Sequence, residues 1–218
     1  ISGGGDVSLL ANGDIENISG TISGDDVSIA STQGSFTNKT LFEQISLDDE
    51  GNRLESHSDE SQITRTFVGD TATVKGGSSV SITTGNSIVS TGAIVESGGD
   101  VTLKALNAIV LDTIQTDTHI DVDGRHKQTV SSDTNYVDSR VTGKDNVTLQ
   151  SGGNLVASGG LVEADESLTI QAGGDVTLLA NETNRYRADV ASYEKEIERQ
   201  TRQEGTTLSA GKSLSITT

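Results

Sequence analysis

A short phrase of aliphatic residue, Ser or Thr, aliphatic residue recurs along this chain and constrains its fold more than any other feature. The phrase occurs eight times, with its first residue at Val7, Val27, Val80, Val101, Val147, Leu168, Val176 and Leu214. The positions of successive first residues differ by 20, 53, 21, 46, 21, 8 and 38. A period near 21 is typical of one coil of a parallel β-helix, in which turns join three short strands. The spacing of 8 fits one step from strand to strand within a coil.

The two aliphatic residues of each phrase lie at positions i and i+2, so they point to the same face of a strand. The Ser or Thr between them points to solvent. This period of 2 indicates strands and not helices. We therefore predict a structural core of stacked aliphatic side chains, made of Val7, Leu9, Val27, Ile29, Val80, Ile82, Val101, Leu103, Val147, Leu149, Leu168, Ile170, Val176 and Leu178.

Further aliphatic pairs occur where the other two strands of a coil are expected. Ile88-Val89 and Ile94-Val95 follow Val80, for example, and glycine pairs such as Gly98-Gly99 allow sharp turns between strands. Aromatic residues make up only 3% of the chain, and Trp, Met, Cys and Pro are absent, which favours a narrow aliphatic interior. The sequence thus predicts an all-β solenoid, whose handedness the period alone does not determine.

Three long gaps in the period predict insertions at about 33–76, 112–145 and 182–212, within a single β-helix domain of residues 1–218 with about five coils. The first insertion has alternating apolar residues on both sides of the turn signal at 48–52, and the second alternates into Asp123-Gly124. Both patterns predict protruding β-hairpins. The third has Val190, Tyr193 and Ile197 at helical spacing but also strand alternation, so helix and hairpin both remain open.

An Asn follows the start of several phrases by five to seven residues, at positions 12, 86, 107, 154 and 181. If these residues stack, their amides could form a ladder of hydrogen bonds from coil to coil. They could equally be turn-forming residues without a ladder. The sequence leaves both interpretations open.

The net charge of −17 makes nucleic acids and anionic membrane surfaces poor partners, because both would repel the chain. The longest apolar stretches, such as 108–111, are much shorter than the roughly 20 residues of a membrane span. The absence of Cys excludes disulfides within the chain. The chain begins at Ile1 without Met or a leader, and we interpret it as a piece of a longer polypeptide.

Sites for chemistry are hard to find in this sequence. His57, His119 and His126 with the Asp residues at 117, 121 and 123 could suggest a metal site, but Val130 stands where a calcium loop needs its bidentate Glu. The Ser residues are numerous and evenly spread, without a convergent base. We therefore predict no catalytic, metal or cofactor site.

Longer phrases connect these repeats to a known family. Gly-Gly-Asp-Val-Thr-Leu occurs at 98–103 and again at 173–178, and Leu-Ser-Ala-Gly-Lys-Ser-Leu-Ser-Ile occurs at 208–216. The sequence resembles the haemagglutinin repeats of filamentous-haemagglutinin-type exoproteins, which include adhesins and the stick proteins of contact-dependent growth inhibition. The resemblance covers nearly the whole chain. It implies a right-handed parallel β-helix on the outer surface of a Gram-negative bacterium, exported by an outer-membrane two-partner transporter.

The first functional hypothesis is therefore a structural, adhesive shaft of a large secreted surface protein, which meets a receptor on a host or neighbouring cell. One alternative is a polysaccharide-cleaving β-helix enzyme, although the few aromatic residues and the lack of paired carboxylates disfavour it. A second alternative is a region that helps a toxin enter a target cell. The sequence does not distinguish this role from passive support.

Overall fold

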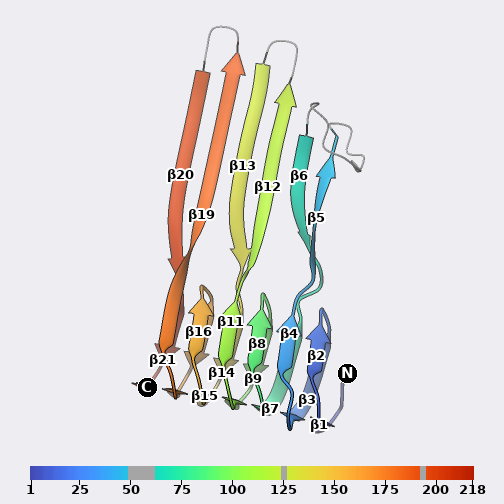
Figure 1. The fold of residues 1–218 in the computed structure, drawn as a ribbon, viewed down its shortest axis with the longest axis vertical. Coiled ribbons are helices and arrows are strands. Elements are labelled where there is room, and N and C mark those ends of the chain that lie inside the picture. The colour runs from blue at the N-terminus through green and yellow to red at the C-terminus, as the bar shows by residue number, and fades with distance from the viewer. Residues whose placement is uncertain (49–61, 124–126, 192–194) are drawn as a thin grey trace.

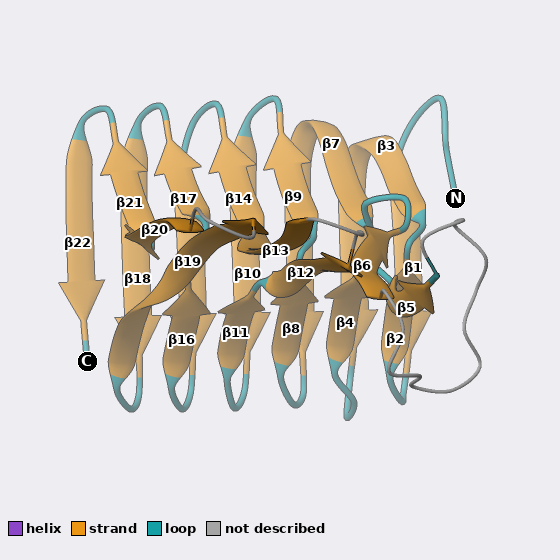
Figure 2. Cartoon of the chain, turned by 90° about the horizontal axis from the view of Figure 1, so that it is seen from above, coloured by secondary structure: helices purple, strands orange, loops and turns teal. Residues whose placement is uncertain are grey.

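The structure is a computed structural model that describes residues 1–48, 62–123, 127–191 and 195–218. These residues contain strands and no helix, and the strands wind into a parallel β-helix from which hairpins protrude (Figure 1). In Figure 2 the strands on the near side run upward while the coils advance from the N-terminus at the right to the C-terminus at the left. The coil is therefore right-handed, as the resemblance implied.

Each coil has three faces, which we number in chain order. Face 1 contains β1 (Val7–Ala11), the second half of β3 (Thr21–Ser31), the second half of β7 (Thr73–Thr84), β10 (Asp100–Ala105), β15 (Val147–Ser151), β18 (Ser167–Ala172) and β22 (Ser213–Thr217). Face 2 contains β2 (Ile15–Ile18), β4 (Phe36–Lys39), β8 (Ile88–Thr91), β11 (Ile109–Asp112), β16 (Leu155–Ser158) and the start of β19 (Val176–Ala191). Face 3 contains the first halves of β3 and β7, then β9 (Ile94–Ser97), β14 (Arg140–Gly143), β17 (Leu161–Ala164) and β21 (Thr207–Ala210).

The repeated phrases of face 1 lie directly over one another. Parallel pairing puts Val7, Val27, Val80, Val101, Val147, Leu168 and Leu214 in one column. A second column contains Leu9, Ile29, Ile82, Leu103, Leu149, Ile170 and Ile216. Side chains in the middle of these columns, such as Val101 and Leu149, are fully buried. The backbone pairing along the axis satisfies the peptide groups while the columns exclude water.

Leu178 departs from the expected core, because 43% of its surface is exposed. The phrase that begins at Val176 belongs to face 2, where β19 pairs with β16 on one side. No described strand covers Leu178 on the other side, which explains its exposure. Leu9 and Val176 are partly buried and pack against the core cluster.

The insertions contain fewer residues than the sequence predicted. Their strands are β5 (Phe42–Leu47) with β6 (Gln62–Val68), β12 (Ile114–Asp123) with β13 (Lys127–Val137), and the outer part of β19 with β20 (Lys195–Gly205). All three are antiparallel hairpins, which confirms the first two predictions and decides the third in favour of a hairpin. The predicted turns at 48–52 and 123–124 lie largely outside the described residues. β4 belongs to face 2, and β14 and β21 belong to face 3. Face 2 thus has six described strands, one for each coil, where the sequence predicted about five coils.

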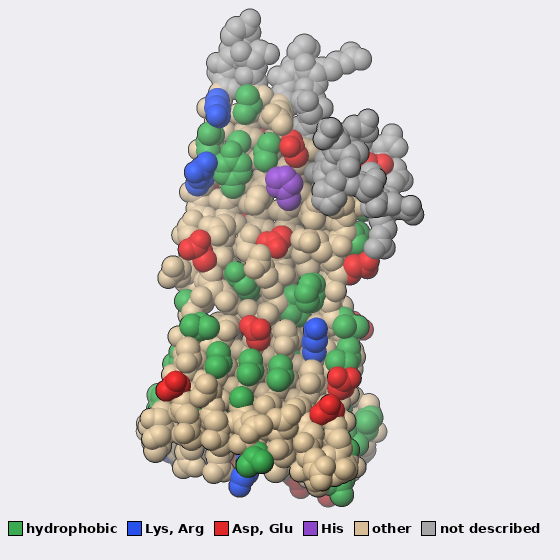
Figure 3. Space-filling view, viewed as in Figure 1, with side chains coloured by type: hydrophobic (Ala, Val, Ile, Leu, Met, Phe, Trp, Pro, Cys, Tyr) green, Lys and Arg blue, Asp and Glu red, His purple; other side chains and the backbone are tan. Residues whose placement is uncertain are grey.

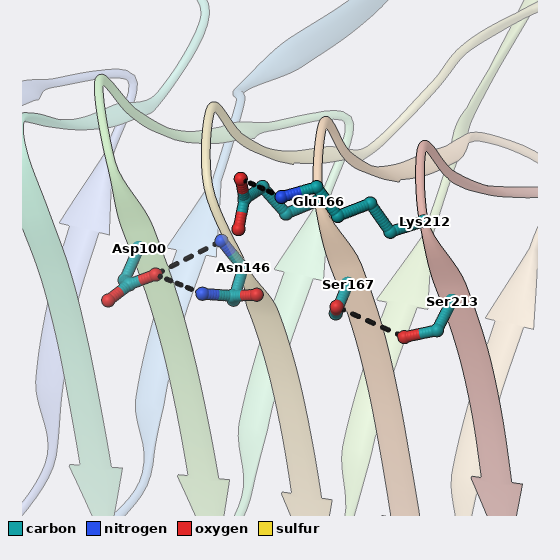
Figure 4. Close-up of polar contacts among 6 residues, drawn as sticks. All are labelled: Asp100, Asn146, Glu166, Ser167, Lys212 and Ser213. Atoms are coloured by element: carbon teal, nitrogen blue, oxygen red, sulfur yellow. Dashed lines mark hydrogen bonds and ion pairs between the residues drawn. The ribbon is translucent and has the colours of Figure 1, made fainter.

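Polar contacts connect the coils at their outer corners. At the corner before face 1, the Asp100 carboxylate accepts hydrogen bonds of 3.0 Å from the backbone N and from Nδ2 of Asn146 (Figure 4). Ser213 Oγ donates to Ser167 Oγ over 3.0 Å, and Lys212 forms an ion pair with Glu166. Each of these contacts joins neighbouring coils at the surface, outside the aliphatic core.

Of the predicted Asn ladder, one link from amide to amide forms among the described residues. Asn107 Nδ2 donates to Asn86 Oδ1 over 2.6 Å, whereas Asn154 Oδ1 accepts a hydrogen bond from the backbone N–H of Asp175 in the next coil, over 3.0 Å, and not from another Asn. A different pair lies inside the shaft, where Asn17 Nδ2 donates to Asn38 Oδ1 over 2.8 Å. Both residues of this second pair are buried, so they replace aliphatic side chains at the end of face 2.

Candidate functional site

Three hairpins leave the shaft at the same corner, between faces 2 and 3. If coils are numbered by their face 2 strands, the hairpins belong to the second, fourth and sixth coils, which contain β4, β11 and β19. They pair edge to edge into one antiparallel sheet of order β5-β6-β12-β13-β19-β20. We call it the protruding sheet. Figure 2, which looks down onto it, shows its strands in one row along the shaft.

The spacing of the coils explains why separate insertions form one sheet. Neighbouring strands lie about 4.8 Å apart, so two coils rise by about 9.6 Å along the axis. A hairpin is two strands wide and occupies the same distance. Hairpins on alternate coils therefore meet edge to edge, whereas hairpins on successive coils would compete for the same space.

Side chains reinforce the two seams between hairpins. Between the first two hairpins, four residue pairs connect β6 to β12, and the backbone N–H of Asp117 donates to Thr66 Oγ1 over 3.0 Å. Between the second and third, eight residue pairs connect β13 to β19. There Thr129 Oγ1 donates to the Asp189 carboxylate over 2.8 Å, and Arg185 lies 3.9 Å from Asp133. Each seam thus combines main-chain pairing with specific polar contacts.

A hydroxyl group secures the base of each hairpin to the shaft. The buried Thr40 Oγ1 donates to Gly92 O over 2.6 Å and accepts from the backbone N of Ala72. The buried Ser139 Oγ lies 2.6 Å from Asp112 O and 3.0 Å from Ser90 O.

At the third hairpin, Thr206 Oγ1 lies 2.9 Å from Ala157 O and 3.0 Å from Leu179 O. We call Thr40, Ser139 and Thr206 the base hydroxyls. Because each reaches backbone groups of neighbouring coils or across the base of its hairpin, they restrict the motion of the protruding sheet relative to the shaft.

On one face of the protruding sheet, polar side chains form a row of hydrogen-bonded groups. The row crosses all six strands and contains Gln44, Thr66, Asp117, Thr134, Asn184 and Thr201. Within it, Thr134 Oγ1 donates to Asp117 Oδ1 and Thr201 Oγ1 donates to Asn184 Oδ1, both over 2.8 Å. Beside the row, the Arg199 guanidinium lies 5.2 Å from the centre of the Tyr186 ring, within the range of a cation–π contact.

The opposite face carries most of the charge of the third hairpin. Arg187 pairs with Asp189 over 3.2 Å, and a shallow groove of about 390 Å³ runs between the second and third hairpins. Asp133, Thr183, Arg185, Gln200 and Arg202 contribute to its lining. Both signs of charge are present in the groove, so it favours neither anions nor cations. Figure 3 likewise shows the two signs interspersed on the surface of the molecule that faces the viewer.

The residues weighed for metal binding do not converge. His119 is exposed on β12 opposite Ser132, while His57 and His126 lie outside the described residues. Asp117 accepts hydrogen bonds from Thr134 and Gln115. In the described ranges there is no group of three His, Cys, Asp or Glu that could hold a metal ion.

One carboxyl group at the base of the protruding sheet is perturbed. Asp138 directly follows β13, beside a surface depression lined also by Arg140 and Glu204. Burial raises the pKa of Asp138, the negative charge of Glu204 adds to the rise, and Arg140 acts against it. The charged form of the Asp138 carboxyl is therefore disfavoured in the folded protein.

Sequence reasoning missed the base hydroxyls and the pairing between hairpins. One signal for the pairing was present, because the spacings of the face 1 phrases alternate: 21, 46, 21 and 46 from Val80 to Leu214 once the face 2 phrase is set aside. This alternation places an insertion on every second coil.

A family model and three curated relatives are similar to this chain. A family model described as a hemagglutinin repeat matches residues 114–191, from the start of β12 to the end of β19. The chain is 31% identical over 183 residues to a tRNA nuclease CdiA of Escherichia coli strain STEC_O31, which is 84% of this chain and 5% of that protein. It is also 31% identical over 183 residues to a tRNA nuclease CdiA of Yersinia mollaretii, with 81% of this chain and 5% of the relative covered.

Another tRNA nuclease CdiA, from Escherichia coli O6:K15:H31, is 38% identical over 109 residues, or 50% of this chain and 3% of the relative. The chain thus spans about one twentieth or less of the length of these curated relatives. No solved structure matches it. Within the described ranges, no helix has the length and apolar character needed to cross a membrane.

Proposed function

Because this chain belongs to the filamentous-haemagglutinin-type repeat regions, we propose that it is a shaft segment of a large secreted surface protein that holds the protruding sheet out for contact with another cell. The supporting observation is that three insertions, separate in sequence, form one sheet secured by the base hydroxyls. A disordered spacer would need neither the seams nor the base contacts.

The proposal includes the partners that the family implies. These are an outer-membrane two-partner transporter during export and a receptor on a host or neighbouring cell. The nuclease activity for which the relatives are named belongs to those proteins, and this segment spans about one twentieth of their length. Among the described residues, no observation favours the polysaccharide-cleaving alternative.

The test removes the protruding sheet from the parent protein. Short turns replace residues 41–70, 114–138 and 180–205, which leave and re-enter the shaft at one corner. We expect unchanged display on the cell surface and loss of binding to target cells. The matched control is Thr102→Lys, which changes an outward position of face 1 and should leave binding intact.

Two results would contradict this role for the protruding sheet. Normal binding by the variant without hairpins would show that contact is made elsewhere. Normal binding with loss of target-cell killing would instead favour the toxin-delivery role. Surface display must be measured in the same cells, because a variant that is not exported would also fail to bind.

A further inference from the structure

The shaft and its hairpins are built from a repeating unit that spans two coils. Val80, Val147 and Leu214 lie in one column of face 1 and are evenly spaced in the sequence, since 147 − 80 and 214 − 147 both equal 67. Hairpin register follows the same offset, since Ile114 pairs with Val137 in the second hairpin and Asn181 pairs with Glu204 in the third. Two of the base hydroxyls, at 139 and 206, are also equivalent. Residues 80–146 and 147–213 are therefore two copies of one unit, each with two coils and one hairpin.

The seam between these two units follows the same rule. Ser131 of β13 pairs with Ile120 on one side and with Arg187 on the other, and these two partners differ in position by the same offset (187 − 120 = 67). Val130 pairs in the same way with Asp121 and Ala188. In this seam, each residue of the second strand of a hairpin pairs with a residue of its own unit on one side and with the equivalent residue of the next unit on the other. The register across a seam can be projected from one unit to another.

β20 is the second strand of the third hairpin and has one partner among the described strands. It pairs with β19 over eleven residue pairs, and all of its residues are exposed. An edge strand of this length presents a row of free N–H and C=O groups on its outer side. Its charged residues, among them Lys195, Glu196 and Glu198, discourage pairing with unrelated strands.

The projected register suits a strand like β19. Glu198 pairs with Arg187 within the hairpin and would lie opposite the Arg187 equivalent of a further unit. By the same rule Ile197 would meet an Ala188 equivalent, and Arg199 would meet a Tyr186 equivalent. Opposite charges also meet at the existing seam, where Arg185 lies beside Asp133. Cross-strand pairs of these kinds stabilise antiparallel sheets.

We propose that the outer edge of β20 is the docking edge for the hairpin of a further copy of this unit, two coils further along the same shaft. Each additional unit then extends the protruding sheet by two strands. Because the added hairpin is attached to the same shaft, it is held beside β20, and its pairing with β20 does not depend on the protein concentration. This inference concerns the assembly of the sheet and does not rest on its role in cell contact.

The test is a chain in which a second copy of residues 147–213 is inserted after Ser213, so that the added hairpin lies two coils beyond the third. Hydrogen exchange of β20 amides is then followed by mass spectrometry. In the native chain, alternate amides of β20 point outward and should exchange fast. In the extended chain we expect about half of the β20 amides to slow at least tenfold, because only the outward-pointing ones gain partners.

The matched control is the same extended chain with the added hairpin replaced by a short turn. It adds the same coils without a strand beside β20, so the fast amides should remain fast. Equal protection of β20 in both extended chains, or no protection in either, would overturn the proposal. Protection in the native chain that increases with protein concentration would assign the edge to a second molecule, and would overturn it too.

Circular dichroism shows whether each extended chain folds, and a failure to fold also tests the proposal. If the control folds and the chain with the added hairpin does not, the hairpin does not fit beside β20 and the proposal is wrong. If neither extended chain folds, the unit cannot be repeated and the proposal fails at its first premise.

Discussion

At the scale of single residues, the shaft depends on side chains that contact their equivalents in the next coil. Val101 lies between Val80 and Val147 in the first column and is fully buried. Ser139 is buried at the base of the second hairpin, where its hydroxyl reaches two backbone carbonyls. Substitutions at these positions affect a contact between coils and not only a local environment.

Val101→Asp should be severely destabilising, because it places an unpaired carboxylate among aliphatic side chains. We expect a loss of several kcal/mol and unfolding of the variant at moderate temperature. Val101→Ala provides the control, since it removes methyl groups without adding charge and should cost about 1–3 kcal/mol. An unchanged thermal midpoint for the Asp variant would contradict the burial of this column.

Ser139→Ala should lower the free energy of unfolding by about 1–3 kcal/mol, because a buried carbonyl loses its hydroxyl donor. Ser8→Ala, at an exposed outward position of β1, is the control and should have almost no effect. Thermal unfolding measures both. Faster hydrogen exchange confined to β12 and β13 in the Ser139 variant would indicate loosening of the hairpin base.

Asp138→Asn should stabilise the protein at neutral pH. The folded state raises the pKa of Asp138 above its ordinary value of 3.8, so the charged form is disfavoured by folding. The penalty is present above the raised pKa and disappears as the pH falls below 3.8, where the carboxyl is protonated in both states. The gain in thermal midpoint should therefore be largest near pH 7 and vanish in acid. The exposed Asp145→Asn variant controls for the loss of one negative charge, and an equal gain at both sites would rule out a local cause.

At the scale of elements, the repeated phrases predicted face 1 and the existence of all three insertions, but not their limits. The strand Phe36–Lys39 was assigned to an insertion because its inward positions hold Phe36 and Asn38 and not two aliphatic residues. Asn38 is tolerated there because Asn17 in the preceding coil donates to it. Such a partner can be recognised only when the coils are stacked.

The pairing between hairpins was not predicted, for a different physical reason. It depends on the equality of two distances, the rise of two coils and the width of a hairpin. No single segment of the sequence shows that the two distances match. Alternation within the second insertion, as at His119 and Ile120, predicted a hairpin but said nothing about its neighbours. The alternating spacings of the phrases held the missing information.

Two deletions test whether the structure repeats in single coils or in units of two coils. Removal of residues 80–146 takes out one whole unit and joins Ser79 to Val147, which occupies the same column as Val80. We expect this shorter chain to fold and to keep a protruding sheet, because two hairpins remain two coils apart. Removal of residues 80–100 takes out one coil and should be much more destabilising, although it is smaller, because the first two hairpins then arise from successive coils.

Thermal unfolding and the β-sheet signal in circular dichroism compare the two deletions. Similar midpoints for both chains would show that hairpin spacing does not matter. The same result would contradict the explanation for why the insertions occupy alternate coils.

At the scale of the whole molecule, shaft and protruding sheet are two β structures with different requirements. Each coil of the shaft contacts only its neighbours, so stability accumulates along the axis, as in other solenoids. The protruding sheet has no covering layer among the described residues, and its cohesion comes from polar rows, ion pairs and the main chain. The large negative charge is spread over both parts and keeps such a surface soluble.

The exit of every hairpin at one corner also has a mechanical consequence. The protruding sheet is a rib along one side of a rod. The hydrogen bonds between its strands run parallel to the rod axis. Bending the rod toward or away from the rib must compress or stretch those bonds. Bending it at right angles to this plane only flexes a thin sheet. A filament built this way is stiff in one plane and compliant in the other, and it presents the same side to its surroundings along its length.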